Sequence, residues 1–141
     1  MIQESGCNDR ETRAKEQIAA FDESEFARLL GIRVIEAGDG FARVAMDCCG
    51  KKNLHGVAHG GAIFALADHA FGMAANCGSD NRVAVSVHIQ FIAPASGPLV
   101  AEAGKVADNG RYSTFRVMVY EGERTIAEFD GVALNVGRTV R

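Results

Sequence analysis

The longest apolar stretch in the chain, residues 62–75, contains only two strongly polar side chains, Asp68 and His69. Its length and composition predict a helix that is apolar on nearly every face, and such a helix lies inside a protein. A carboxylate in that place must be paired, neutralised or functional, because desolvating an unpaired charge is expensive. The pattern therefore predicts a buried central helix over residues 59–75 and marks Asp68 as a candidate functional residue.

An alternating pattern, typical of β-strands, appears on both sides of this helix. Residues 32–48 predict two strands joined by the Gly38-Asp39-Gly40 turn, and residues 83–91 predict a strand with one apolar and one mixed face. The three remaining expected strands are 99–107, 112–120 and 124–136. We therefore expect an α+β domain in which a helix packs on an antiparallel sheet of about six strands, the last four in a meander.

The N-terminal residues 1–25 are expected to form a polar tail with a short helix, followed by the folded domain at 26–141. Residues 1–12 lack a periodic apolar pattern, and the residues after them carry apolar side chains at the spacing of short helical pieces. Ser24 is placed to cap the second piece and Gly31 to end it. One domain is expected because the chain is long enough for one core and short for two.

Composition and charge argue against several classes of function. The net charge is −3 and the 15 Lys and Arg are scattered, so we expect no nucleic-acid partner. No apolar window reaches the roughly 18 residues of a membrane span, and the charged N-terminus lacks a secretory signal pattern. We therefore expect no membrane partner and a cytoplasmic location. The four cysteines contain no C-x-x-C pair and are expected to be reduced thiols.

A polar cluster precedes the apolar helix, with Asn53, His55 and His59 in a loop and Gly60-Gly61 at the helix start. Helix N-termini present unpaired N–H groups and partial positive charge, and glycines let a carbonyl oxygen approach closely. This pattern fits an oxyanion-type site, but taken alone it is more often a tight turn with His59 as the helix cap. The two histidines have the spacing of a zinc-binding helix pair, but the glutamate of that motif is missing and we expect no metal site.

Asp68 lies eight residues beyond Gly60, which on a helix corresponds to about 12 Å. The two residues therefore cannot serve the same carbonyl within one chain. Across a twofold axis, Asp68 of one subunit could face the Gly60 terminus of the other, so that dimerisation would build the site. An unpaired edge strand is a natural place for two copies to join. His69 points about 100° away from Asp68 around the helix, so we expect structural packing or a hydrogen bond to a neighbour and no catalytic role.

Three segments of the chain together resemble the hotdog-fold thioesterases of the PaaI-like, phenylacetic-acid degradation type. They are Asn53-x-His55-x-x-x-His59-Gly60-Gly61, Leu66-Ala67-Asp68 and Phe91-Ile92-Ala93-Pro94. The resemblance covers residues 26 to 137 and implies a hotdog fold, a curved antiparallel sheet around a long central α-helix. It also implies a homodimer with active sites at the subunit interface, and a homotetramer built from two such dimers.

The activity that the resemblance implies is hydrolysis of an acyl-coenzyme A, with an aryl-acetyl or medium-length acyl group, to free acid and coenzyme A. Asp68 would be the general base or nucleophile, and the Gly60 amide with Asn53 would polarise the thioester carbonyl. His59 would orient the loop or the carbonyl. Coenzyme A is part of the substrate, and no cofactor is implied. The further expected substrate contacts are His55, Gly61, Ser86 and Arg111.

The chain departs from the family pattern at two positions. Ala84 stands where relatives often have Ser or Thr, so Ser86 is the candidate for a hydroxyl near the reacting water. Ala93 replaces a basic residue that is common before the proline, so Arg111 is the candidate for the nucleotide end of coenzyme A.

Two other functions stay open at this point. One is a non-catalytic acyl-coenzyme A sensor, although residues 1–25 show no added DNA-binding region as its output. The other is a hotdog enoyl-coenzyme A hydratase or dehydratase, in which His59 and Asp68 would move protons to and from carbon.

Overall fold

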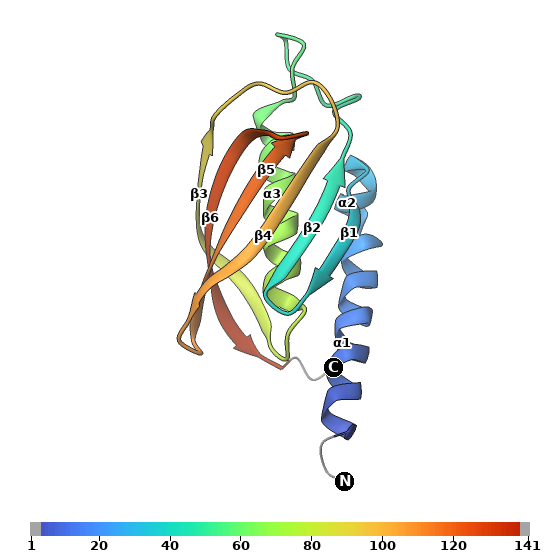
Figure 1. Cartoon of the computed structure of the whole chain (residues 1–141), viewed down its shortest axis with the longest axis vertical. Coiled ribbons are helices and arrows are strands. Elements are labelled where there is room, and N and C mark those ends of the chain that lie inside the picture. Colours follow the sequence, from blue (N-terminus) through green and yellow to red (C-terminus); the bar gives the residue numbers. More distant parts are fainter. Residues whose placement is uncertain (1–3, 139–141) are drawn as a thin grey trace.

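A curved sheet around one long helix forms the body of the computed structural model, which describes residues 4–138 (Figure 1). Its elements are α1 (Glu4–Asp22), α2 (Glu25–Leu30), β1 (Arg33–Gly38), β2 (Phe41–Met46), α3 (Gly60–Asn76), β3 (Asn81–Phe91), β4 (Leu99–Asp108), β5 (Tyr112–Glu121) and β6 (Arg124–Gly137). Every neighbouring pair of strands is antiparallel. The predicted α+β class, the six strands and the central helix are therefore confirmed.

The strand order, β1-β2-β4-β5-β6-β3, differs from the predicted meander in one place. β4, β5 and β6 do follow one another, but β3 pairs with β6 at the far edge of the sheet. The reason is that α3 crosses the sheet between β2 and β3 and delivers the chain to that edge, so the next loop must return across the end of the sheet to β4 (Figure 1). As a consequence, one edge of β3 has no neighbouring strand within residues 4–138.

The core lies between α3 and the concave face of the sheet, and Phe71 of α3 lies at its centre. The Phe71 ring meets those of Phe115 and Phe129 at centroid distances of 5.4 and 5.7 Å. Gly131 provides the space, because a Cβ there would lie 2.8 Å from Phe71 Cζ. Burying a ring of this size stabilises the fold by about 1.5–3 kcal/mol. This packing fixes the middle of α3, including the turn that carries Asp68, against the sheet.

The N-terminal segment is more helical than its sequence pattern predicted. Instead of a polar tail followed by short pieces, one continuous helix, α1, runs over Glu4–Asp22. Phe21 of α1 packs on α3, where a Cβ on Gly72 would lie 3.4 Å from the Phe21 ring. Arg13 donates a hydrogen bond to the Gly78 carbonyl at 2.7 Å. These two contacts hold α1 along the outer side of α3, and the division into tail and domain at residue 25 stays a prediction.

The short helix α2 begins and ends as predicted. The Ser24 side chain accepts a hydrogen bond from the Ala27 N–H, and Gly31 ends the helix in the left-handed conformation at φ 67°. The N–H of Gly31 then bonds to the Arg28 carbonyl at 3.2 Å. Within residues 4–138, no helix is both long and apolar enough to cross a membrane.

Candidate active site

The start of α3 is held by a side-chain cap. His59 has extended backbone (φ −62°, ψ 136°), and its Nδ1 accepts a hydrogen bond from the Gly61 N–H at 2.8 Å. The N–H groups of Ala62 and Ile63 bond to the His59 carbonyl. Within residues 4–138, the Gly60 N–H has no acceptor, so it is the free donor at the positive end of the helix dipole. His59 is therefore the helix cap, one of the two arrangements that the sequence allowed.

Asn53 organises the loop ahead of α3 with its carboxamide oxygen. Oδ1 accepts the N–H groups of His55 and Val57 at 2.9 and 3.3 Å, and the Asn53 N–H donates to the Val57 carbonyl at 2.8 Å. The Nδ2 group has no acceptor among the described residues. Asn53 thus uses its oxygen to shape the loop and keeps a donor available, which is what polarising a carbonyl requires.

Asp68 lies in the middle of α3, half-buried, without a hydrogen bond or ion pair to any residue of the described chain. Burial raises the pKa of its carboxyl above the ordinary value for aspartate. Perturbed pKa values cluster at functional sites, so Asp68 is a candidate functional residue. α3 is continuous from Gly60 to Asn76, so Asp68 and the Gly60 N–H are about 12 Å apart along the helix and do not meet within one chain.

His69 is turned away from Asp68 and packs under α1. Its ring meets the Phe21 ring edge-on at a centroid distance of 5.5 Å. Burial lowers the pKa of the imidazole, and the nearby Asp22 carboxylate opposes that effect only in part. The buried Nε2 of His69 makes no hydrogen bond within the described chain. Of the two predicted arrangements, the structure shows the packing of His69 against a neighbour.

Phe91 was not among the predicted site residues, yet its ring lies directly over Gly60. A Cβ built on Gly60 would lie 3.4 Å from Phe91 Cζ. Phe91 is the last residue of β3 and is 55% exposed, so the ring covers the helix start without being buried itself. The only signal in the sequence is the place of Phe91 in the family-like segment before Pro94. An alternating strand pattern does not indicate which distant residue the end of the strand will contact.

β3 presents apolar side chains along the exposed edge of the sheet. Val83, Val85 and Val87 are 48%, 50% and 36% exposed. Ser86, a predicted substrate contact, lies among them and is also exposed. An open edge with exposed apolar side chains is a surface that pairs readily with another strand.

Arg111 belongs to the turn between β4 and β5, and this turn lies at the opposite end of the sheet from the start of α3 (Figure 1). It is exposed in the β4–β5 turn, with its guanidinium 5.5 Å from the centre of the Tyr112 ring. Its carbonyl accepts the N–H of Asn135, whose Nδ2 also reaches Asp80, just beyond the C-terminal end of α3. Within a single chain, Arg111 is therefore far from the predicted site residues at the start of α3.

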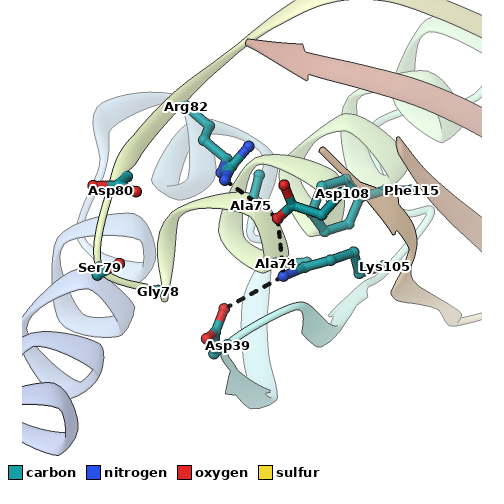
Figure 2. A pocket seen from close by; sticks show the side chains of 10 residues that line it. All are labelled: Asp39, Ala74, Ala75, Gly78, Ser79, Asp80, Arg82, Lys105, Asp108 and Phe115. Atoms are coloured by element: carbon teal, nitrogen blue, oxygen red, sulfur yellow. Dashed lines mark hydrogen bonds and ion pairs between the residues drawn. The ribbon is translucent and has the colours of Figure 1, made fainter. Parts of the chain in front are cut away.

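A small polar cavity of about 190 Å³ lies at that same end of α3, close to Arg82 and Lys105. Figure 2 shows Lys105 between Asp39 and Asp108, with Arg82 on the other side of Asp108. Arg82 also donates to the Ser113 hydroxyl at 3.0 Å. Both cations are therefore paired, and these bonds connect β3, β4, β5 and the β1–β2 turn.

The two loop histidines occupy different surroundings. Both side chains are exposed, but Nδ1 of His59 accepts the Gly61 N–H, whereas the His55 side chain has no hydrogen bond within the described residues. Within residues 4–138, no three His, Cys, Asp or Glu side chains lie close enough together to hold a metal ion. The polar groups nearest the helix start are therefore hydrogen-bond donors and loop anchors.

Known proteins resemble this chain in both sequence and structure. A family model described as the thioesterase superfamily matches residues 55–128. The acyl-coenzyme A thioesterase PaaI of Escherichia coli is 31% identical over 126 residues, which cover 86% of this chain and 90% of that protein.

Solved structures extend the similarity to nearly the whole chain. The structure of the E. coli PaaI protein from the phenylacetic acid degradation operon matches with a TM-score of 0.85 and 29% identity, covering 92% of this chain and 98% of that one. A Thermus thermophilus protein matches with a TM-score of 0.77 and 33% identity, covering 81% of this chain and 99% of that one. The expected hotdog fold is confirmed.

Proposed function

Since the chain belongs to the thioesterase superfamily and is a thioester hydrolase, we propose that its substrate is an acyl-coenzyme A with an aryl-acetyl or medium-length acyl group. Support for the substrate class comes from the E. coli relative, which is named an acyl-coenzyme A thioesterase and belongs to a phenylacetic acid degradation operon. The observation that carries the mechanism is Asp68, a half-buried carboxylate without a partner in the described chain.

The thioester carbonyl binds at the start of α3. Its oxygen accepts the free N–H of Gly60, where the positive end of the helix dipole stabilises the negative charge that develops during attack. Nδ2 of Asn53 is the second donor. His59 keeps the loop and the first turn in register through its bond to Gly61. The Phe91 ring over Gly60 limits access of water to this oxygen, which strengthens both hydrogen bonds.

Asp68 activates the attacking group. As a general base it accepts a proton from water, whose oxygen bonds to the acyl carbon; the C–S bond then breaks and the coenzyme A thiolate leaves and is protonated. As a nucleophile its carboxylate instead forms an acyl anhydride that water hydrolyses. A raised pKa makes the ionised carboxylate a stronger base in either role. Side chains, backbone donors and water supply every step, so no cofactor is required.

A homodimer brings Asp68 to the Gly60 N–H of a second chain. Antiparallel pairing of two β3 edges about a twofold axis extends the sheet and lays two α3 helices side by side in opposite directions. Asp68 in the middle of one helix then faces the N-terminal half of the other. The exposed apolar side chains of β3 support this interface. Two such dimers form the homotetramer that the family resemblance implies.

The same pairing would bring Arg111, one of the expected substrate contacts, to an active site. It places the start of one β3 beside the end of the other, so Arg111, near the C-terminal end of α3, contributes to the site of the second chain. There its guanidinium binds the nucleotide end of coenzyme A. His55 and Ser86 contact the substrate from the loop ahead of α3 and from β3.

The decisive experiment is thiol release from a panel of acyl-coenzyme A thioesters by the parent chain and by D68N. We expect turnover by the parent and none by D68N, with both proteins folded. D130N is the matched control, because Asp130 is an exposed aspartate whose partner is the surface residue Arg116. Parental turnover by D68N would refute the role of Asp68.

The same panel separates the two other functions that the sequence left open. Stoichiometric binding of acyl-coenzyme A without thiol release would indicate a sensor. Loss of the conjugated absorbance of an enoyl-coenzyme A without thiol release would indicate a hydratase. Either outcome would contradict the proposed hydrolysis.

A further inference from the structure

Three loops meet at the end of the sheet where α3 begins: the loop at 47–59, the loop at 92–98 and the β5–β6 turn (Figure 1). The first is bonded to the second at two points. The Ala58 N–H donates to the Ala95 carbonyl at 2.7 Å, and the Cys48 thiol donates to the Gly97 carbonyl at 2.9 Å. The segment that leads into α3 is therefore held from outside by the loop between β3 and β4.

That β3–β4 loop is in turn held by Glu121, the last residue of β5. Oε2 of Glu121 accepts the N–H groups of Ser96 and Gly97 at 2.9 and 2.6 Å. Oε1 accepts a hydrogen bond from the Arg124 guanidinium at 2.6 Å, and the same guanidinium donates to the Pro94 carbonyl at 2.8 Å. One carboxylate thus joins the β5–β6 turn to the middle of the β3–β4 loop.

The electrostatics of Glu121 agree with this geometry. The two backbone N–H groups, with smaller contributions from Arg124, lower the pKa of the carboxyl to about 2. Glu121 is therefore ionised throughout the pH range in which proteins work. Glu123, in the same turn, is exposed and makes no hydrogen bond or ion pair within the described chain. The two acids of one turn thus have different surroundings.

We propose that Glu121 is a positioning residue for the Gly60 N–H. Its carboxylate holds the N–H groups of Ser96 and Gly97, which positions the neighbouring Ala95 carbonyl. That carbonyl accepts the N–H of Ala58, two residues before Gly60. Glu121 itself touches no substrate. This inference rests on the proposed function, in which the Gly60 N–H binds the reacting oxygen. Displacing such a donor by about 1 Å is enough to slow a reaction by up to about 100-fold.

The experiment combines backbone amide hydrogen exchange with steady-state kinetics on E121A, E121Q and E123A. In E121A we expect the amides of Ser96, Gly97 and Ala58 to exchange at least about tenfold faster. We expect kcat to fall by about tenfold or more, with a smaller change in KM, because the donor acts on the transition state more than on binding. Thermal unfolding, followed in parallel, shows that each variant is folded at the assay temperature.

Two variants make the test specific. E121Q keeps an oxygen that can accept the Ser96 and Gly97 N–H groups, so its exchange and kcat should lie between those of the parent and E121A. E123A removes the other carboxylate of the turn and should match the parent in every measurement. If E121A does not fold, faster Ala58 exchange in E121Q still supports the proposal, and parental Ala58 exchange in E121Q overturns it.

The results also separate this proposal from the proposed function. Faster exchange at Ser96 and Gly97 with parental exchange at Ala58 and parental kcat would show that Glu121 holds only its own loop, which overturns the inference. A parent chain that releases no thiol from any acyl-coenzyme A would refute the proposed function instead. In that case the Ala58 exchange of E121A still decides whether Glu121 positions the start of α3.

Discussion

Nδ1 of His59 accepts the N–H of Gly61 at 2.8 Å, and this bond decides which donor of the glycine pair is free. The Gly61 N–H is occupied by the cap, so of the two glycines it is Gly60 whose N–H has no acceptor within residues 4–138. Ser, Thr, Asp and Asn are the usual caps, and histidine performs the same task here with a ring nitrogen. The cap and the proposed oxyanion donor are therefore adjacent parts of one turn.

Replacing His59 with alanine is expected to lower the free energy of unfolding by about 1 kcal/mol, because the first turn of α3 loses its side-chain acceptor. H59N should restore most of that stability, since an asparagine oxygen can accept the same N–H. Urea unfolding measures both effects. If His59 acts only by holding the turn, H59N also recovers most of the thiol release. A stable H59N without turnover would show that the imidazole itself acts on the substrate.

The substitution Gly60→Ala is expected to lower kcat/KM without lowering the stability of the fold. Gly60 is outside the positive-φ region, and the added Cβ would meet the Phe91 ring at 3.4 Å, an ordinary contact. Stability should therefore match or slightly exceed that of the parent. The methyl group keeps a carbonyl oxygen away from the N–H, so kcat/KM should fall by about 100-fold. G72A is a control, because it adds a methyl to the same helix at 3.4 Å from Phe21. Parental turnover by G60A would exclude Gly60 as the donor.

Much of the fold could be predicted from the sequence because its signals are local. In β5 the alternating residues Ser113, Phe115, Val117 and Val119 are all buried, as a two-residue period requires. The Ser24 cap, the Gly31 end and the apolar run of α3 are equally local, and each was confirmed. The half-buried Asp68 could be found because one carboxylate interrupts an otherwise apolar helix.

The remaining features depend on contacts between distant segments. β3 lies beside β6 because α3 carries the chain across the sheet, which no strand pattern records. The Phe91 ring over Gly60 and the Glu121 bonds to the β3–β4 loop have the same origin. α1 is longer than the predicted short helix, because its first half lacks apolar periodicity. Its run of good helix formers and pairs such as Glu11 and Lys15, four residues apart, were the available signal.

The pKa shift of Asp68 predicts how stability changes with pH. Burial raises the pKa of the Asp68 carboxyl in the folded state, so the folded chain favours the protonated form. The free energy of unfolding is therefore highest below the ordinary pKa of aspartate and falls as pH rises through the raised pKa. D68N cannot ionise, and its melting temperature should exceed that of the parent by a few degrees at neutral pH. The difference should close below the ordinary pKa of aspartate, about 3.9. A D68N variant that melts below the parent at neutral pH would show that the ionised Asp68 is stabilised by a partner.

The same shift predicts the pH dependence of thiol release. Either role of Asp68 requires the ionised carboxylate, so kcat should rise with pH through the raised pKa and then level off. D130N should show the same profile as the parent, because Asp130 is a surface residue paired with Arg116. A kcat that is constant across the acidic range would contradict the role of Asp68 as base or nucleophile.

Mixing two inactive variants tests whether each active site is shared between subunits. D68N lacks the proposed base and G60A lacks access to the proposed donor, so each homodimer should be inactive. After unfolding and refolding together, half of the dimers contain one chain of each kind, and one of their two sites combines an intact Asp68 with an intact Gly60. Thiol release should then recover to about a quarter of the parental rate.

Refolding each variant alone, followed by mixing without subunit exchange, is the control and should recover nothing. If the mixed dimers stay inactive although their formation is confirmed by native mass spectrometry, Asp68 and Gly60 do not act across the interface. A parent chain that is active as a monomer would lead to the same conclusion, because the two groups are about 12 Å apart along one helix.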